Sequence, residues 1–232
     1  MLLVLAVAGA TFASTVAGGL AAMRWSSGPG LLVSFAGGVV LGAAVFDLLP
    51  EAVDHAGRSG VPPALPVICA GLGYAAAREV ERRSGHEHGP GRVGVAGAAG
   101  FTAHSFFDGV AIGLGFQLSD GAGVVVALAV VGHDFADGLS TVSYLVAHGH
   151  GARPQRLWLL ADATAPLVGA AVTAVSPVPE AVCPVALGLF AGVFVRAATS
   201  SLIPRAMRSA PVLASALAAG GAGLMFAVSR VA

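Results

Sequence analysis

The sequence predicts an all-α fold, that of a polytopic membrane protein with eight transmembrane helices. Of the 232 residues, 56% are hydrophobic and only 10% are charged, whereas an average soluble domain is about 25% charged. The mean hydropathy is +0.84, and the apolar residues form runs long enough to cross a bilayer. This composition cannot supply the polar surface of a soluble globule, so we expect the lipid bilayer to surround the chain.

Eight apolar segments of roughly 18 to 25 residues are the predicted membrane helices. In chain order they are residues 2–23, 31–52, 62–78, 93–116, 122–147, 156–177, 181–204 and 211–229. Glycine, proline or charged residues separate most of them, as is typical of helix ends and turns. The first segment has no positively charged region before its apolar run, so we expect a retained span rather than a cleaved signal peptide.

The arginines predict the orientation of the chain, because cytoplasmic loops of membrane proteins carry an excess of positive residues. Of the twelve arginines, nine lie in the first, third, fifth and seventh connections, Arg196 lies inside a span, and the opposite side has only Arg58 and Arg230. Both termini are therefore expected outside and the third connection, residues 79–92, in the cytoplasm. The formal net charge of zero argues against a nucleic-acid partner.

Two stretches in the fourth and fifth spans repeat one polar pattern, HSFFDGVAIG from His104 and HDFADGLSTV from His133. In each, an aspartate follows four residues later, so Asp108 and Asp137 share a helix face with the histidines. A charged group at the bilayer centre costs about 2.5–3.5 kcal/mol on insertion scales and usually marks a functional pathway. The buried polar set is Asp47, His104, Asp108, His133, Asp134, Asp137, Asp162 and Arg196.

Imidazoles and carboxylates in this combination favour a divalent transition cation such as zinc, iron or manganese. The absence of thiolate ligands disfavours copper(I), and a bound cation would offset carboxylates that could not all ionise together. A proton relay and a structural ion-pair network are the alternatives. The occurrence of the pattern on two adjacent spans favours the metal site.

The sequence also predicts an inverted repeat. The two histidine motifs lie on helices of opposite direction and are expected to meet at the midplane, as is common around transporter sites. The second span ends in FDLLPEA, residues 46–52, at the predicted outer face, and the seventh ends in SSLIPRA, residues 200–206, at the inner face. Spans one to three and six to eight are therefore predicted to be inverted copies around spans four and five.

These features resemble the ZIP family (the ZRT/IRT-like proteins), and in pattern its short bacterial GufA-like branch. The resemblance rests on the eight spans, the outward termini, the histidines of the third connection, the HNxP(D/E)G-type motif on both central spans, and LLPEA. It implies a ZIP-like bundle over residues 1–232, a single transporter domain in the cell membrane. The substrate would be zinc, with iron, manganese or cadmium as alternatives, moved towards the cytoplasm. No enzymatic activity and no organic cofactor are expected, and a homodimer stays open.

The resemblance further implies roles for particular residues. The first metal site would hold His104, Asp108, His133 and Asp137; the second would hold Ser105, Asp108, Asp134 and Asp162, with Asp108 and Asp137 able to bridge. Asp47 and Glu51 would line the outer entrance path, or would simply form a carboxylate pair at the membrane surface. His86 and His88 of the third connection, like His148 and His150 of the fifth, would bind metal in the cytoplasm or would be ordinary solvated loop residues.

The chain departs from the family pattern at several positions. Ser105 stands in place of an asparagine, Phe107 and Ala136 in place of the motif prolines, and Ala165 in place of a glutamate, for which Asp162 is a nearby substitute. Arg196 is unusual for the family. We expect it to pair with Asp162 or Asp134 and to take the place of a second ion, unless it faces away and extends towards the membrane surface.

Three other functions stay open. One is a membrane-embedded zinc-dependent hydrolase, in which the metal activates water; the symmetric motifs at mid-depth argue against it. A second is a proton-coupled carrier of another small solute. The third is a metal sensor that does not transport, which the departures from the family pattern favour.

Overall fold

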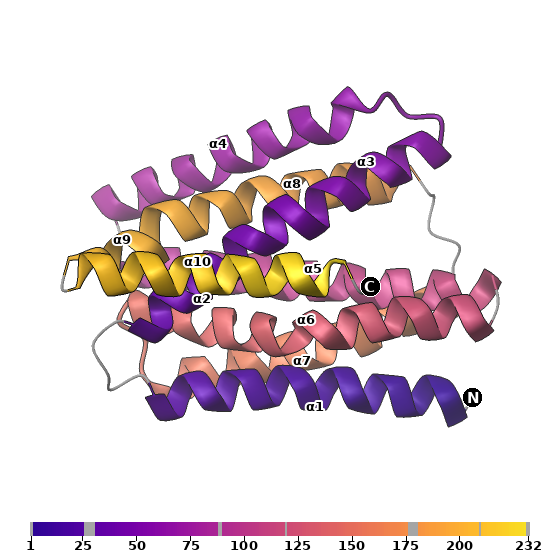
Figure 1. Ribbon diagram of the computed structural model, residues 1–232, viewed down its shortest axis with the longest axis horizontal. Helices are drawn as coiled ribbons and strands as arrows, with labels where there is room; N and C mark the ends of the chain where they lie inside the picture. Colours follow the sequence, from indigo (N-terminus) through magenta and orange to yellow (C-terminus); the bar gives the residue numbers. More distant parts are fainter. Residues whose placement is uncertain are drawn as a thin grey trace.

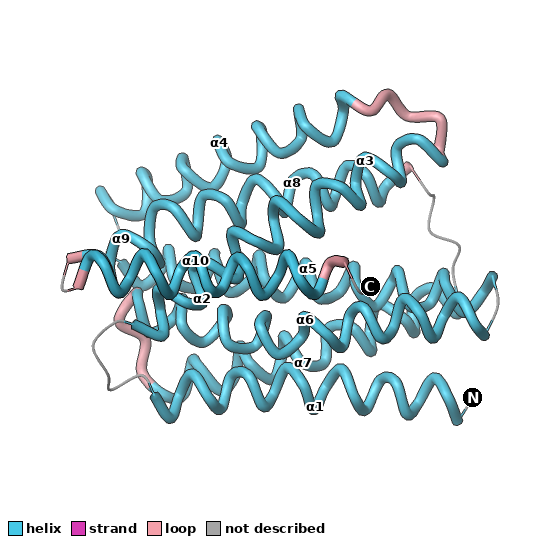
Figure 2. The backbone as a smooth tube through the Cα atoms, viewed as in Figure 1, coloured by secondary structure: helices cyan, strands magenta, loops and turns pink. Residues whose placement is uncertain are grey.

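The computed structural model describes residues 2–25, 31–87, 90–118, 120–175, 181–208 and 210–230. Within these ranges all regular secondary structure is helical (Figures 1 and 2), which confirms the all-α prediction. The elements are α1 Leu2–Trp25, α2 Leu31–Ala43, η1 Ala44–Leu48, α3 Leu49–Arg58, α4 Ala64–Glu87, α5 Pro90–Leu118, α6 Asp120–Ala147, α7 Ala152–Val175, α8 Val182–Ala197, η2 Ala198–Leu202, α9 Ile203–Met207 and α10 Pro211–Val228. Because α2–η1–α3 and α8–η2–α9 are each continuous, the described chain forms eight long helical segments.

Three of these segments are long and apolar enough to cross a membrane when the described residues alone are searched. They are Val33–Arg58, Val182–Ser200 and Pro211–Val228. Large apolar side chains also lie on the outside of the bundle, such as Val212, which is 84% exposed, and Leu128, which is 67% exposed. An apolar exterior of this kind is stable in lipid and unfavourable in water.

The helices pack in two groups. The first consists of α1, α5, α6 and α7; within it α1 packs most extensively on α6 and α5 on α7. The second consists of α2–α3, α4, α8–α9 and α10; within it α4 packs most extensively on α8 and α2 on α10. In Figure 1 the second group contains the uppermost helix, α4, and the first group contains the lowest, α1.

Glycines bring the paired helices into close contact. A Cβ atom on Gly138 of α6 would overlap the carbonyl group of Thr15 on α1, and one on Gly18 of α1 would overlap the carbonyl group of Phe135 on α6. Small residues at such crossings let membrane helices approach closely, and van der Waals packing then holds them together. The other three helix pairs have the same reciprocal contacts. They are α5–α7 through Gly109 and Gly169, α2–α10 through Gly38 and Gly221, and α4–α8 through Gly73 and Gly192.

Two short π-helical segments interrupt the second group. η1 begins six residues before Pro50, and η2 begins six residues before Pro204. Proline has no N–H and its ring clashes with the preceding turn, and a widened turn is one way in which a helix accommodates it. These are the two places where the sequence contains FDLLPEA and SSLIPRA. π-Helical turns occur often at functional sites.

The third connection is shorter than predicted. Residues 79–92 were expected to form a loop, but α4 continues to Glu87 and α5 begins at Pro90, so that prediction is wrong for most of the segment. Glu79 accepts hydrogen bonds from Arg82 and Arg83, three and four residues later, a spacing that stabilises a helix. These hydrogen bonds lower the pKa of Glu79 to about 2. His88 and the side chain of His86 lie outside the described residues.

Candidate metal centre

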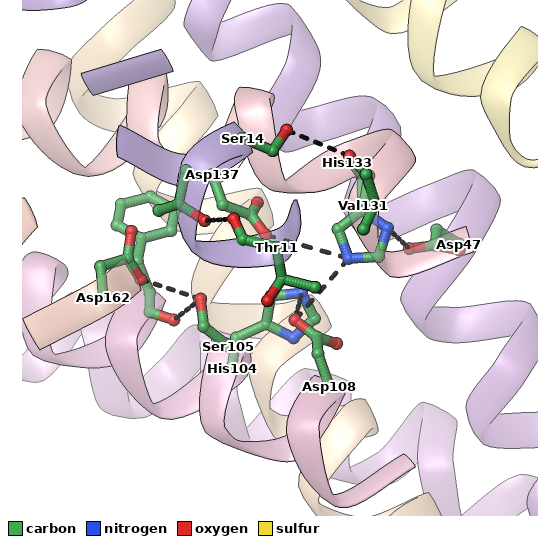
Figure 3. A network of polar contacts seen from close by, with 12 residues as sticks. Thr11, Ser14, Asp47, His104, Ser105, Asp108, Val131, His133, Asp137 and Asp162 are labelled. Atoms are coloured by element: carbon green, nitrogen blue, oxygen red, sulfur yellow. Dashed lines mark hydrogen bonds and ion pairs between the residues drawn. The ribbon is translucent and has the colours of Figure 1, made fainter. Parts of the chain in front are cut away.

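Four buried side chains from two helices meet inside the first helix group. They are His104 and Asp108 of α5 and His133 and Asp137 of α6. One ligand atom from each lies within 4.8 Å of the other three, and the side chains point towards one another in Figure 3. The spacing of four residues places each pair on one helix face, and the glycine contacts of Gly109 and Gly138 lie directly beside the two aspartates.

The spacing of these atoms fits a metal ion better than a hydrogen-bond network. The Nε2 atom of His104 lies 3.4 Å from Oδ2 of Asp108, and Nε2 of His133 lies 3.7 Å from the same oxygen and 3.9 Å from Oδ2 of Asp137. Most of these separations are too long for hydrogen bonds. Ligands bound at about 2.1 Å to a tetrahedral zinc ion are themselves roughly 3.4 Å apart. These three separations are close to the spacing that a four-coordinate divalent ion requires, and the widest separation in the set, at up to 4.8 Å, is larger.

Several atoms of the cluster have no hydrogen-bond partner. The Nε2 atom of His133, Oδ2 of Asp108, Oδ2 of Asp137 and Nδ1 of His104 are all buried and have no hydrogen-bond partner. An unsatisfied buried polar group costs about 1–3 kcal/mol, and more if it is charged. A bound cation would remove that cost, so the donor set fits a metal.

A second polar group lies beside these four side chains. Asp162 of α7 accepts a hydrogen bond of 2.8 Å from Ser105 (Figure 3), so the structure brings together two residues predicted for the second site. It accepts a second hydrogen bond of 2.8 Å from Thr141. Asp134 is fully buried, and both of its carboxylate oxygens lack a partner. Sequence analysis missed Thr141, whose only signal is its position one turn after Asp137.

The two carboxylates predicted for the entrance differ in their surroundings. Asp47, in η1, has an oxygen 3.9 Å from Nδ1 of His133, and its side chain is 22% exposed. It thus connects the buried cluster to a more open region. Glu51 lies one turn further along α3 and is 3.7 Å from Nε2 of His55, a histidine that sequence analysis did not single out.

Arg196 does not pair with Asp162 or Asp134 as predicted. Its guanidinium group donates to Glu81 of α4, at 2.8 Å from Nε, and to the hydroxyl group of Tyr74 at 3.4 Å. The prediction was wrong because it ended the third span at residue 78 and assigned Glu81 to a loop. The continuation of α4 to Glu87 brings Glu81 alongside α8, so Arg196 supplies no charge in place of a second ion.

Aromatic rings cover the cluster on the side of α8. The ring centroid of Phe194 lies 5.1 Å from that of His104, and the centroid of Phe190 lies 6.0 Å from it. Phe194 also packs against Phe101 of α5, at 4.8 Å between centroids. Sequence analysis did not single out these residues, whose signal is the apolar pair four residues apart in α8. They exclude water from the imidazole of His104.

The histidines of the fifth connection bond to the backbone. Nδ1 of His148 lies 2.8 Å from the carbonyl oxygen of Tyr144, and Nε2 of His150 lies 2.7 Å from that of Gly91. His150 therefore ties the α6–α7 connection to the start of α5. These contacts give both residues a structural role.

Comparison with known proteins gives one result. The sequence model of the ZIP zinc transporter family matches residues 75–229. This range is two thirds of the chain and includes all four residues of the buried cluster. No curated protein matches the chain.

Proposed function

The chain belongs to the ZIP zinc transporter family, whose members are divalent-metal transporters, and we propose that it carries zinc across the cell membrane towards the cytoplasm. The proposed binding site is the cluster of His104, Asp108, His133 and Asp137. The observation that carries this proposal is a buried set of two imidazoles and two carboxylates whose ligand atoms lie within 4.8 Å of one another and include atoms without a hydrogen-bond partner. Iron, manganese and cadmium are the alternative substrates, because imidazole and carboxylate ligands also suit them.

We propose that the eight helical segments are eight spans of one transporter domain over residues 1–232, arranged as an inverted repeat. The register of the glycine contacts supports the repeat. Thr15 and Gly18 of α1 correspond to Pro166 and Gly169 of α7, Phe106 and Gly109 of α5 to Phe135 and Gly138 of α6, Phe35 and Gly38 of α2 to Leu189 and Gly192 of α8, and Ala70 and Gly73 of α4 to Ala218 and Gly221 of α10. In every case the second residue follows the first by three positions. The matched positions of η1 and η2 give independent support.

The division into two helix groups suits an alternating-access mechanism. The four proposed ligands belong to α5 and α6 of the first group, whereas Asp47 and Phe194 approach them from the second group. An elevator-like translation or a rocking rotation of the first group against the second would carry the ligands from one side to the other. We propose that both termini face outwards and that metal enters past Asp47 and Glu51, in line with the distribution of arginines.

A second ion would find its ligands beside the first. Asp134 has two unpaired oxygens, and Asp162 and Ser105 are already joined by a hydrogen bond. Arg196 bonds to Glu81 instead, so it does not compete with a cation for these carboxylates. We therefore keep Ser105, Asp134 and Asp162 as the proposed second site. We also propose that His86 and His88 bind the metal on the cytoplasmic side, and that the protein forms a homodimer.

The test of this function is zinc-65 uptake into proteoliposomes that contain the purified protein. We expect uptake that saturates with zinc concentration and that cadmium or manganese reduces by competition, in contrast to vesicles without protein. Absence of saturable uptake for zinc and for the competing metals would overturn the proposal. Zinc-dependent hydrolysis of lipid or amide substrates without net metal flux would instead favour the hydrolase.

The entrance carboxylates are expected to affect uptake at low zinc concentration. Asp47→Asn together with Glu51→Gln removes two negative charges from the path that leads to His133, which lowers the local concentration of cations. We expect the zinc concentration for half-maximal uptake to rise several-fold while the maximal rate changes little. Asp54→Asn, an exposed carboxylate on the same helix, is the matched control. Equal effects of Asp54→Asn and of the double variant would argue for a general surface-charge effect.

A further inference from the structure

A cavity of about 200 Å³ lies between α4, α5, α6 and α8. Its walls are formed by alanine, glycine, valine and aromatic residues, together with Glu81. The carboxylate of Glu81 accepts hydrogen bonds from Arg196 and from Ser200, so the charge that it brings to the wall is already neutralised. An apolar cavity of about 150 Å³ in another protein stays free of water and binds benzene. The present cavity is therefore large enough for an apolar ligand.

The cavity opens to the outside of the bundle between α4 and α5. Ala76 and Val80 of α4 and Ala96 of α5 line it and are exposed, Val80 by 43%; we call these three residues the lip of the cavity. The opening exists because α4 packs most extensively on α8 and much less on α5. The inner end is closed by the buried rings of Phe101 and Tyr144. Since the lip lies close to the adjoining ends of the predicted third and fourth spans, we expect lipid to face it.

Two arginines share the helix faces of the lip. On α4, Arg83 follows Ala76 by seven residues and Val80 by three. On α5, Arg92 precedes Ala96 by four residues. These spacings place residues on one face of a helix. Because α5 begins soon after α4 ends, both arginines lie at the same end of the bundle, about one turn beyond the lip.

These arginines give this end of the opening a positive charge. The side chain of Arg83 is 72% exposed, and Arg92 is exposed as well. Arg83 shares the carboxylate of Glu79 with Arg82, so these three residues keep one positive charge in excess. Arg92 forms no ion pair with any other residue that the structure describes. Basic groups between membrane helices at the cytoplasmic surface bind the head groups of anionic lipids.

We propose that the cavity and the two arginines together bind an anionic phospholipid of the cytoplasmic leaflet. One acyl chain enters the cavity past the lip, and the phosphate group lies between Arg83 and Arg92, whose guanidinium groups bind it through charge-assisted hydrogen bonds. The dimensions agree, because the helix from Ala76 to Arg83 spans about 10 Å and the hydrocarbon part of one leaflet is about 15 Å deep. This site is independent of zinc binding and requires only that a bilayer surrounds the chain in the proposed orientation.

The bound acyl chain would contact both helix groups. The walls of the cavity come from α5 and α6 of the first group and from α4 and α8 of the second. A ligand shifts a protein towards the arrangement that it binds best, and movement of one group against the other would change the shape of this cavity. The phospholipid is therefore expected to slow that movement.

The head-group contact is tested by native mass spectrometry of the purified full-length protein with phosphatidylglycerol and phosphatidylcholine of identical acyl chains. We expect phosphatidylglycerol to bind more tightly. Arg83→Gln/Arg92→Gln should reduce this preference by roughly fivefold for each arginine, which corresponds to about 1 kcal/mol per basic residue near an anionic surface. Arg78→Gln is the matched control, because Arg78 is an exposed arginine of α4 whose position two residues after Ala76 turns it away from the lip. No preference in wild type, or an equal loss in Arg78→Gln, would overturn the proposal.

The acyl-chain contact is tested by filling the opening. Ala96→Phe places a large ring at the lip and should reduce the binding of both phospholipids. Ala75→Phe, at an exposed position of α4 outside the cavity lining, should leave their binding unchanged. Ala76→Phe fills the lip from α4 and should act as Ala96→Phe does, so it serves as the second variant if Ala96→Phe does not fold. Binding at the wild-type level in these lip variants would place the acyl chain outside the cavity and overturn the proposal.

Zinc uptake tests the effect of the phospholipid on movement, and this part alone rests on the proposed function. At saturating zinc, phosphatidylglycerol in the vesicles should lower the maximal rate of wild type and have less effect on Arg83→Gln/Arg92→Gln. An equal effect on both proteins would overturn the role of the site in movement. Absence of zinc uptake by wild type would overturn the transport function, and the mass spectra would still decide whether the phospholipid site exists.

Discussion

Replacing His104 and His133 with alanine is expected to abolish saturable zinc uptake. The double variant removes both imidazoles from the cluster and leaves Asp108 and Asp137 as its only ligands. Changes to groups that merely orient a ligand cost about 10–100-fold in metal affinity, so loss of two ligands is expected to lower the affinity by at least about 100-fold. Zinc uptake and equilibrium zinc binding, both measured on the purified protein, check the two parts of this result.

Thermal unfolding in detergent distinguishes loss of the site from loss of the fold. If zinc binds the folded state and not the unfolded state, a zinc concentration one hundred times the dissociation constant stabilises the folded state by about 2.7 kcal/mol. Zinc should therefore raise the unfolding temperature of wild type and have little effect on the double variant, which should still unfold cooperatively without zinc. His148→Ala, which removes an imidazole that bonds to the backbone outside the cluster, should keep the response to zinc. An equal zinc-induced shift in the double variant would contradict the assignment of the ligands.

The sequence predicts the helices of this protein well because their signal is local. An apolar run bounded by glycine, proline or charge is visible in one segment, and seven of the eight segments match the observed helices within a few residues, apart from extensions of α3 and α9. The exception is α4, whose last turns carry Glu79, Arg82 and Arg83 and are not apolar. Those turns are stabilised by ion pairs along the helix, which a hydropathy pattern does not detect.

The candidate site is likewise predicted only where its signal lies within a single helix. The pairs His104–Asp108 and His133–Asp137 follow from a spacing of four on one helix, and the repetition of the motif indicates that the pairs face one another. Contacts between distant helices have no such signal. The hydrogen bond from Thr141 to Asp162, and the packing of Phe194 on His104, depend on how α5, α6, α7 and α8 cross.

The partner of Arg196 is a further contact that the sequence does not predict. Charge balance required a carboxylate partner, and the sequence offered several aspartates at a similar membrane depth. The choice of Glu81 depends on the extra turns of α4 and on the close approach of α4 to α8 at Gly73 and Gly192. That approach is a property of the packed bundle. Composition and spacing therefore predict that Arg196 has a carboxylate partner, but they do not identify which carboxylate it is.

Substituting alanine for Gly138 or for Gly109 is expected to disrupt the protein severely. A Cβ atom at Gly138 would overlap the carbonyl group of Thr15, and one at Gly109 would overlap that of Pro166. Backbone atoms cannot rotate away as a side chain does, so the paired helices must separate. Overpacking of this kind costs about 1–3 kcal/mol and sometimes more. Each glycine also follows a proposed ligand directly, so separation of the helices would displace Asp137 or Asp108.

Comparison of the two alanine variants tests the proposed inverted repeat, because the repeat makes Gly138 and Gly109 equivalent. Both alanine variants should lower the unfolding temperature in detergent by similar amounts, and both should lower zinc uptake. Gly71→Ala, at a helical glycine with no atom within 4 Å of the added Cβ, should unfold at or above the wild-type temperature, because alanine favours a helix more than glycine does. Unequal effects at Gly138 and Gly109 would show that α1–α6 and α5–α7 are not matching contacts. Equal and large effects would mean that each half of the repeat holds its own histidine and aspartate in place through the same backbone contact, so that the metal site depends on the two halves equally.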